Sequence, residues 1–166
     1  RWLVGMVACA IDDNVQNHQL MLLHGAQGKG KSTFIRHLLP PELKDYYRNG
    51  MIIPENNNHL LQLSSCLLIN LDEFDTLSPE RMQNLKSLIT QDVVNERKVY
   101  DIQNYTYIRR ASFIASTNNP HCMPDVKENR RILFSTLLNI DYHTPVNHEG
   151  IYAQAYALYR QGFQYW

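Results

Sequence analysis

Residues 25–32 of the chain read Gly25-Ala26-Gln27-Gly28-Lys29-Gly30-Lys31-Ser32. This stretch decides the predicted fold, because it satisfies the pattern GxxxxGK[ST] at every fixed position. A short apolar run at residues 19–24 predicts a strand before it, and residues 32–39 predict a helix after it. A glycine-rich loop between a strand and a helix is the setting that a phosphate-binding loop requires, so the sequence predicts one here.

The loop predicts a nucleotide site that uses magnesium. Its glycines allow the backbone N–H groups to surround phosphates. We expect Lys31 to reach the β- and γ-phosphates and Ser32 to ligate Mg²⁺, with Thr33 completing the nucleotide-binding set. The alternative, a flexible turn of glycine and lysine, does not explain the flanking strand and helix. No guanine-reading motif of the NKxD type is present, so the sequence favours ATP.

A pair of acidic residues follows a second predicted strand. The continuous apolar run at residues 66–71 is typical of a buried strand, and it ends in Asp72-Glu73. Ligands bind at the carboxyl ends of the strands in open α/β sheets. We therefore expect Asp72 to hold Mg²⁺ and Glu73 to orient and deprotonate the attacking water. Solvated turn residues are the alternative for such a pair, but its place after the loop in the chain favours function.

Polar and basic residues follow a third predicted strand, residues 111–116. Asn118 is a candidate to hold the γ-phosphate or the lytic water, although Asn-Asn-Pro is also a natural turn. Arg130 and Arg131 come next, before a further short strand at residues 132–134. Phosphoryl transfer needs positive charge on the developing anion, often from an arginine of a neighbouring subunit. Paired arginines at a solvated edge are the alternative.

The remaining pattern predicts an α/β fold. Apolar residues at helical spacing and capping signals predict helices at residues 2–11, near 60–61, from 78 to about 91 and at 151–161. Residues 93–110 carry tyrosines and β-branched residues in loose alternation and predict a β-hairpin. Strands that alternate with helices predict a mostly parallel central sheet covered by helices on both faces.

Composition limits the class of protein. The 166 residues suit one domain, 1–166, and the chain opens in an apolar helix without an initiator methionine, so we expect a domain cut from a longer protein. Sixteen basic residues balance sixteen acidic ones, so contact with nucleic acid would need a local patch. Three widely spaced cysteines argue against a disulfide framework or a zinc site. No stretch approaches the ~20 apolar residues of a membrane span, and we expect a cytoplasmic protein.

The motifs, taken in order, resemble those of the virulence-associated protein E family. The resemblance rests on the loop at residues 25–32, on Leu71-Asp72-Glu73, Ser116-Thr117-Asn118 and Asn129-Arg130-Arg131, and on the first and last predicted helices. The members are P-loop domains of phages, plasmids and genomic islands, similar in motif order to superfamily-3 helicases and to AAA+ ATPases. The resemblance implies a P-loop NTPase fold and the ATP-hydrolysing core of a replication protein.

The resemblance also implies roles and partners. Asn118 would be the sensor and Arg131 the arginine finger. Arg130 is the other candidate for the finger, because Ile132 stands where the family commonly has an aromatic residue. The ATPase core of related proteins is expected to act on single-stranded or replicating DNA as a homo-oligomeric ring, a hexamer.

The predicted hairpin has a counterpart in superfamily-3 helicases, where it points a basic residue into the central channel. Here the expected tip, residues 101–104, has no lysine or arginine, and the basic residues lie on the arms. The candidates for DNA contact are Arg97, Lys98, Arg109 and Arg110, with ordinary surface charge as the equal alternative.

Two functions from different classes remain. The leading one is an ATP-driven DNA motor or remodeller, a helicase-like module of a mobile element. The other is an ATP-dependent switch or assembly module that binds partner proteins without translocating on DNA. A small-molecule or nucleotide kinase shares the loop, but a glutamate suited to activating water argues against it.

Overall fold

The computed structural model describes residues 1–52, 57–71, 74, 77–97, 104–120, 122 and 131–165 of the chain. A five-stranded sheet lies at its centre, with the strand order β2-β3-β6-β1-β7. Every neighbouring pair in it is parallel. The strands are β1 (Leu20–His24), β2 (Tyr47–Asn49), β3 (Leu68–Leu71), β6 (Ser112–Thr117) and β7 (Ile132–Thr136). β6 therefore lies between β1 and β3, although it follows both along the chain.

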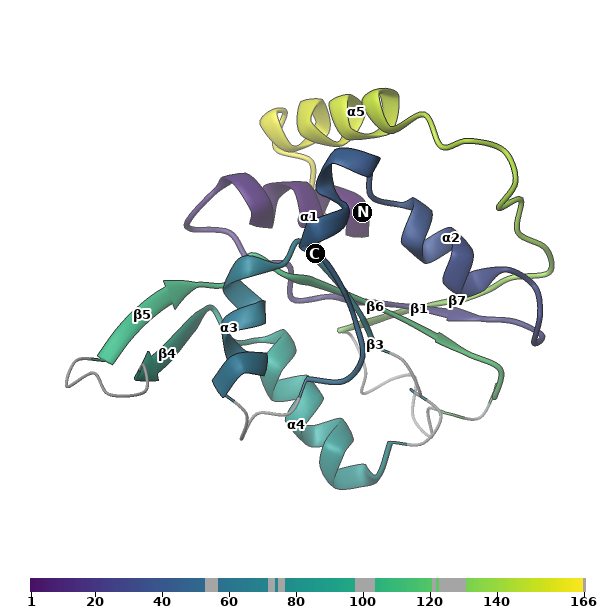
Figure 1. Ribbon diagram of the computed structural model, residues 1–166. Coiled ribbons are helices and arrows are strands. Elements are labelled where there is room, and N and C mark those ends of the chain that lie inside the picture. The colour runs from purple at the N-terminus through teal and green to yellow at the C-terminus, as the bar shows by residue number, and fades with distance from the viewer. Residues whose placement is uncertain are drawn as a thin grey trace.

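Helices cover both faces of this sheet (Figure 1). On one face lie α1 (Trp2–Ile11) and α2 (Lys31–His37), with α5 (His148–Arg160) packed against α1; on the other lie α3 (Asn57–Ser65) and α4 (Pro79–Ile89). A 3-10 helix, Pro41–Tyr46, leads from α2 to β2. Within the described ranges, no helix is long and apolar enough to cross a membrane. The predicted α/β fold with a mostly parallel sheet between helices is confirmed.

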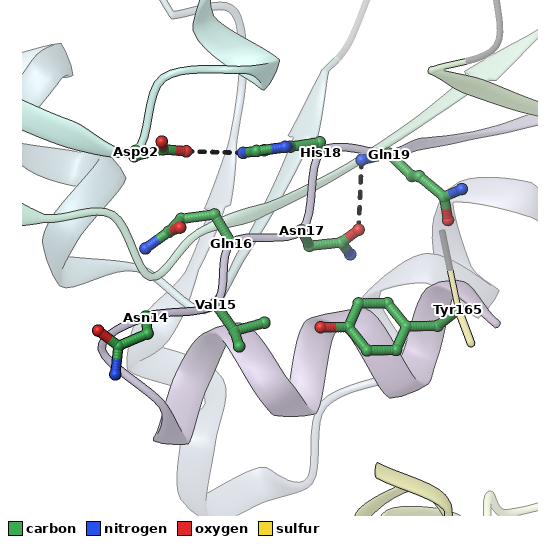
Figure 2. Close-up of a pocket in the computed structure, with 8 residues that line it drawn as sticks. All are labelled: Asn14, Val15, Gln16, Asn17, His18, Gln19, Asp92 and Tyr165. Atoms are coloured by element: carbon green, nitrogen blue, oxygen red, sulfur yellow. Dashed lines mark hydrogen bonds and ion pairs between the residues drawn. The ribbon is translucent and has the colours of Figure 1, made fainter. Parts of the chain in front are cut away.

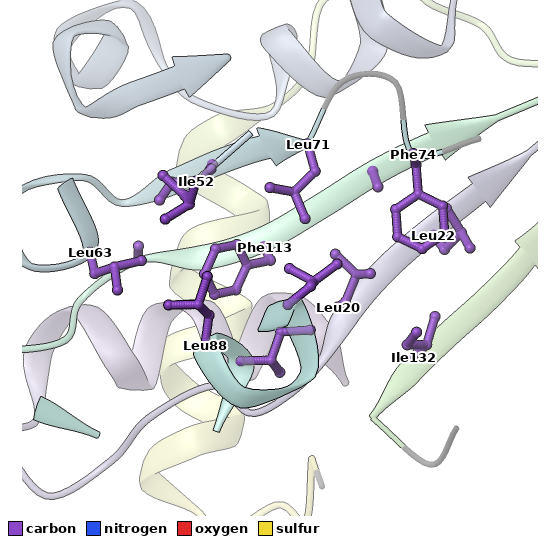
Figure 3. Packing of buried hydrophobic residues seen from close by; sticks show 14 of the residues in the cluster. Leu20, Leu22, Ile52, Leu63, Leu71, Phe74, Leu88, Phe113 and Ile132 are labelled. Carbon is purple, nitrogen blue, oxygen red and sulfur yellow. The ribbon is translucent and has the colours of Figure 1, made fainter. Parts of the chain in front are cut away.

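The strands bury both faces of the sheet because successive side chains point to opposite sides. In β1, Leu22 packs into the core beside α3 and α4, whereas Leu23 packs into the core beside α1 and α2. In β6, Phe113 and Ile114 divide in the same way. Figure 3 shows the first core, where Leu88 of α4 and Phe113 are among the side chains that meet. Burial on both faces explains why these strands read as continuous apolar runs.

A two-stranded antiparallel hairpin, β4 (Val93–Arg97) and β5 (Asn104–Ile108), projects from the body of the fold (Figure 1). Its base is attached to the body, since Val94 is buried in the core beside α3 and α4. Arg109 N also donates to the Asp92 carbonyl oxygen at 3.0 Å, which closes the hairpin at its root. The predicted hairpin is confirmed, while residues 98–103 lie outside the described residues.

Side-chain caps account for two helix starts. Ser78 is the predicted cap of α4, and its hydroxyl accepts a hydrogen bond from Arg81 N at 3.3 Å. α5 begins at His148, earlier than the predicted residue 151, because the Asn147 side chain caps it by accepting from Gly150 N at 2.9 Å. The 3-10 helix and β2 are not predicted from the sequence.

Candidate functional site

Three parallel strands end together at one edge of the sheet. His24, the last residue of β1, is paired with Thr117 in β6 and with Thr136 in β7. Two backbone hydrogen bonds continue this alignment past the strand ends. Gly25 N donates to the Thr117 carbonyl oxygen at 3.2 Å, and Leu137 N donates to the His24 carbonyl oxygen at 2.8 Å. The segments that follow β1, β6 and β7 therefore meet at this edge.

The glycine-rich loop, residues 25–32, starts at this edge and leads into α2. Gly30 caps the helix with a φ of 77°, in the left-handed region that favours glycine, and its carbonyl oxygen accepts from Phe34 N at 2.8 Å. Gly25 approaches the neighbouring segment closely, since a Cβ there would lie 2.9 Å from the Leu137 carbonyl oxygen. Local geometry thus requires both glycines that the motif fixes.

Lys31 joins the loop to the end of β6. Its side chain is 7% exposed, and its ammonium donates to three oxygens. These are the carbonyl oxygens of Gly25 at 2.6 Å and Ala26 at 2.9 Å, and the Oδ1 atom of Asn118 at 2.7 Å. A lysine ammonium has three N–H donors and no acceptor, so it is the donor in all three hydrogen bonds. They hold its positive charge at the junction of the loop and β6. The structure brings Lys31 and Asn118 together.

A cavity of about 380 Å³ opens beside this junction. It is lined by residues 27–33 of the loop and the helix start, and by Ser116, Asn118 and Tyr142. Ser32 and Thr33 are exposed there, whereas Lys31 is buried in the wall. Hydroxyl groups, backbone and an ammonium beside an open cavity are groups that bind an anionic, oxygen-rich ligand.

The predicted acidic pair, Asp72 and Glu73, lies outside the described residues. Leu71, which ends β3, is paired with Ala115 in β6, so β3 points to the same edge as the loop. No group of three or more His, Cys, Asp or Glu side chains that could hold a metal occurs among the described residues. The hydroxyl of Ser32 and the carboxylate of Asp72 are oxygen ligands of the type that Mg²⁺ takes in proteins.

Arg131 lies at the opposite edge of the sheet. Its carbonyl oxygen accepts from Leu20 N at 2.8 Å, and the next residue, Ile132, is paired with Leu20 at the start of β1. The five residues of β1 separate this edge from the loop, a span of roughly 16 Å. The structure therefore does not bring Arg131 to the cavity of its own chain. Arg130, the other candidate, lies outside the described residues.

Arg109 is not a surface residue, which corrects its place among the candidate DNA contacts. Its side chain is fully buried, and its guanidinium donates to the carbonyl oxygens of Ala111 and Asn17, both at 3.0 Å. Burial lowers the pKa of this guanidinium below its usual value. The neighbouring Arg110 is partly exposed and forms an ion pair with Asp13.

The other two candidate DNA contacts belong to the hairpin. Arg97 is the last residue of β4 and is paired with Asn104. Lys98 lies outside the described residues. Arg109 and Arg97 therefore lie at opposite ends of the hairpin, and only the Arg97 end is away from the body of the fold.

A second cavity, of about 420 Å³, lies beside the residues that lead into β1 (Figure 2). His18 and Asp92 face each other there, with the Nε2 atom of His18 2.7 Å from a carboxylate oxygen of Asp92. The lining consists of residues 14–19, Asp92 and Tyr165. None of these described lining residues is a lysine or arginine, so this cavity is less suited to phosphates than the one beside the loop.

The sequence did not identify two residues that line the cavity beside the loop. Ser116 immediately precedes Thr117-Asn118 in a motif that drew attention only to its last residue. Tyr142 lies between β7 and α5, far along the chain from the loop, and no local pattern marks it. Adjacency to a motif could have found Ser116, whereas only the fold reveals Tyr142.

Comparison with known proteins gives a family and a fold. A model of the virulence-associated protein E-like domain matches residues 1–166. Three solved structures of similar fold are apo forms of the NrS-1 C-terminal region, with TM-scores of 0.57, 0.58 and 0.57 at 16%, 18% and 15% sequence identity. They cover 94%, 98% and 95% of this chain, which spans only 37%, 39% and 38% of theirs. At these identities the likeness shows the fold alone. No match was found among curated proteins.

Proposed function

The chain belongs to the virulence-associated protein E-like domain family, and from this membership and the loop geometry we propose that it is a magnesium-dependent ATPase with a P-loop. The observation that carries the proposal is the buried ammonium of Lys31, held by Gly25, Ala26 and Asn118 beside the cavity. Hydrogen bonds between an ammonium and phosphate oxygens are charge-assisted and strong. A triphosphate in the cavity would therefore find a cation already in place, and its oxygens would take over hydrogen bonds that the ammonium donates to protein oxygens in its absence.

The proposed hydrolysis assigns one role to each polar residue of the site. Lys31 binds the β- and γ-phosphates, and residues 25–33 provide the backbone that surrounds them. Asn118 holds the Lys31 ammonium from the end of β6 and senses the γ-phosphate. Glu73 deprotonates the attacking water. Ser32 and Asp72 would hold magnesium, which neutralises the phosphate charge that develops during transfer.

The wider role follows from the family resemblance and from the lack of a guanine-reading motif. We propose that the nucleotide is ATP and that the chain is the core of a replication protein of a phage, plasmid or genomic island, working in the cytoplasm. In this role it is a helicase-like, AAA+-related DNA motor that acts as a homo-oligomeric ring, a hexamer. The second candidate is an ATP-dependent switch that recruits partner proteins without translocating on DNA.

Two variants test the ATPase proposal on the full-length protein. Lys31→Ala should lose most Mg-ATP binding and turnover, because it removes the cation that faces the phosphates. Glu73→Gln should keep Mg-ATP affinity but slow hydrolysis by roughly two to four orders of magnitude, the usual share of a general base. Near-normal turnover by Lys31→Ala would contradict the proposal, and a loss of affinity in Glu73→Gln would instead make Glu73 a ligand.

A turnover measurement separates the motor from the switch. ATP hydrolysis by the full-length protein is measured with and without single-stranded DNA. A DNA motor should hydrolyse ATP faster on DNA, because translocation couples the two sites. A rate of ATP hydrolysis that does not change at saturating DNA concentration would favour the switch.

A further inference from the structure

Residues 137–147 form a segment, here called the strap, that joins β7 to α5 and runs along α2 (Figure 1). At its start, Leu137 N donates a hydrogen bond to the carbonyl oxygen of His24 at the end of β1, and Leu137 lies against Gly25. Beyond its end, the Nε2 atom of His148 lies 2.8 Å from the His37 carbonyl oxygen, and the Tyr152 hydroxyl donates to the Leu38 carbonyl oxygen at 3.1 Å. The strap is thus anchored at the start of the glycine-rich loop and at the end of α2.

A local turn fixes the middle of the strap. The Asp141 carboxylate accepts from the backbone N of His143 at 3.1 Å, from Thr144 N at 3.0 Å and from the Thr144 hydroxyl at 2.6 Å. The hydrogen bonds from Thr144 and His143 lower the pKa of Asp141, so its carboxylate stays ionised in more acidic solution than an ordinary aspartate does. Tyr142 lies inside this turn, and its ring centroid is 4.1 Å from that of His143.

The turn presents the Tyr142 ring to the glycine-rich loop. A Cβ on Gly30 would lie only 2.0 Å from Cδ1 of Tyr142 and 2.3 Å from Cε1, so this edge of the ring lies against Gly30. Tyr142 also lines the cavity beside the loop. The other described lining residues are glycine, serine, threonine, asparagine, glutamine or lysine, which makes Tyr142 the one flat apolar surface among them.

We propose that Tyr142 stacks on the nucleobase of the bound nucleotide and makes the site prefer a nucleotide to a bare polyphosphate. The inference rests on the proposed function. The loop offers backbone and Lys31 to the phosphates, whereas the attached base is planar and apolar on its faces and needs a surface of the same kind. Stacking on an aromatic ring tolerates every base, since every base has a π-face. Tyr142 therefore selects for the presence of a base and not for its identity.

Equilibrium titrations with two probes test this assignment. Mg-ATP and magnesium tripolyphosphate are titrated into the wild-type protein and into Tyr142→Ala and Tyr142→Phe. Tyr142→Ala should weaken Mg-ATP binding about ten-fold, the effect of losing one stacked base, and leave tripolyphosphate binding unchanged. Tyr142→Phe keeps the ring and should bind both probes as the wild type does. Tyr156→Ala, which removes an exposed tyrosine from α5, is the matched control and should change neither.

Other results would overturn the assignment. Equal weakening of both probes by Tyr142→Ala would show that the ring only supports the loop. Tighter binding of tripolyphosphate by Tyr142→Ala would show that the wild-type ring occupies part of the phosphate-binding site. A wild-type protein that binds neither probe would overturn the proposed function as well. If the wild type binds both probes and Tyr142→Ala leaves the ratio of their two affinities unchanged, only the stacking role is overturned. Melting temperatures of all variants exclude unfolding as the cause.

Discussion

Gly30 is subject to two separate constraints. Its φ of 77° lies in the left-handed region, and its Cα lies against the Tyr142 ring. Gly28 has the same φ of 77°, but a Cβ there would meet no atom within 4 Å. An alanine at Gly28 should therefore introduce backbone strain alone, whereas an alanine at Gly30 should introduce both backbone strain and steric overlap.

We predict that Gly30→Ala destabilises the protein more than Gly28→Ala does. Each change should cost about 1 to 2 kcal/mol of unfolding free energy for the left-handed backbone. Gly30→Ala should cost about 1 to 3 kcal/mol more, because its new methyl group displaces the Tyr142 ring. Urea unfolding measures both values. In a Tyr142→Ala background the extra cost of Gly30→Ala should disappear, and its persistence would show that the ring is not the obstacle.

Single residues of the site differ in how far the sequence predicts them. The contact between Lys31 and Asn118 follows from a fixed motif and from parallel strands that end at one edge, so both residues could be identified in advance. Tyr142 reaches the loop only through the turn at Asp141 and the strap that carries it. Such a contact depends on tertiary structure, and no spacing within the sequence encodes it.

At the scale of elements, Arg109 joins the segment that leads into β1 to the start of β6. Its guanidinium bonds to Asn17, which precedes β1, and to Ala111, which precedes β6. Its Cζ atom lies 5.8 Å from the ring centroid of Phe113, within the range of a cation–π contact. In the sequence, Arg109-Arg110 has the pattern of a charged hairpin arm, and only the fold shows that the first arginine turns inward.

We predict that Arg109→Ala lowers the unfolding free energy by about 3 kcal/mol, because it leaves a cavity and removes the hydrogen bonds that Arg109 donates to two carbonyl oxygens. Arg110→Ala is the matched control, since its partly exposed ion pair with Asp13 should contribute no more than about 1 kcal/mol. Chemical denaturation measures both. Similar costs for the two variants would mean that Arg109 is not the buried connection described above.

The hairpin gives a prediction about DNA. Replacing Arg97 and Lys98 together by alanine should weaken binding of single-stranded DNA and reduce the slope of log affinity against log salt by about 1.4, at ~0.7 for each lost phosphate contact. Arg160→Ala, at the end of α5, is the control and should leave the slope unchanged. A slope that stays constant in the double variant would identify these residues as ordinary surface charge.

Elements with strong local signals were predictable, and an edge strand was not. α1, α4 and the hairpin follow from apolar spacing, from the Ser78 cap and from alternation. β2 has only three residues, Tyr47–Asn49, and none of them is fully buried. It is held by pairing with β3 and by the Asn70 side chain, which donates to Oδ1 of Asn49 at 2.6 Å. Its stability comes from a neighbour, so its own sequence carries no periodic signal.

At the scale of the whole molecule, the parallel sheet separates two charges that the proposed chemistry needs together. All strand ends that build the cavity lie at the edge where β1 ends, whereas Arg131 lies where β1 begins. One chain therefore cannot bring Arg131 to its own Lys31 without rearranging the sheet. A neighbouring copy in a ring could present its Arg131 edge to this cavity, which is the arrangement that an arginine finger requires.

We predict that Arg131 acts on ATP held by a neighbouring protomer. Its guanidinium would contact charge that grows in the transition state, so Arg131→Ala should lower turnover far more than nucleotide affinity. Arg131→Ala subunits keep an intact loop, and Lys31→Ala subunits keep an intact arginine. Mixing the two inactive preparations should restore hydrolysis at interfaces that pair one with the other. If subunits exchange and no activity returns, Arg131 does not act in trans. Arg131 would then support the fold, because the sheet keeps it away from the cavity of its own chain. If the recovery of hydrolysis depends on Arg130 and not on Arg131, then Arg130 is the arginine finger.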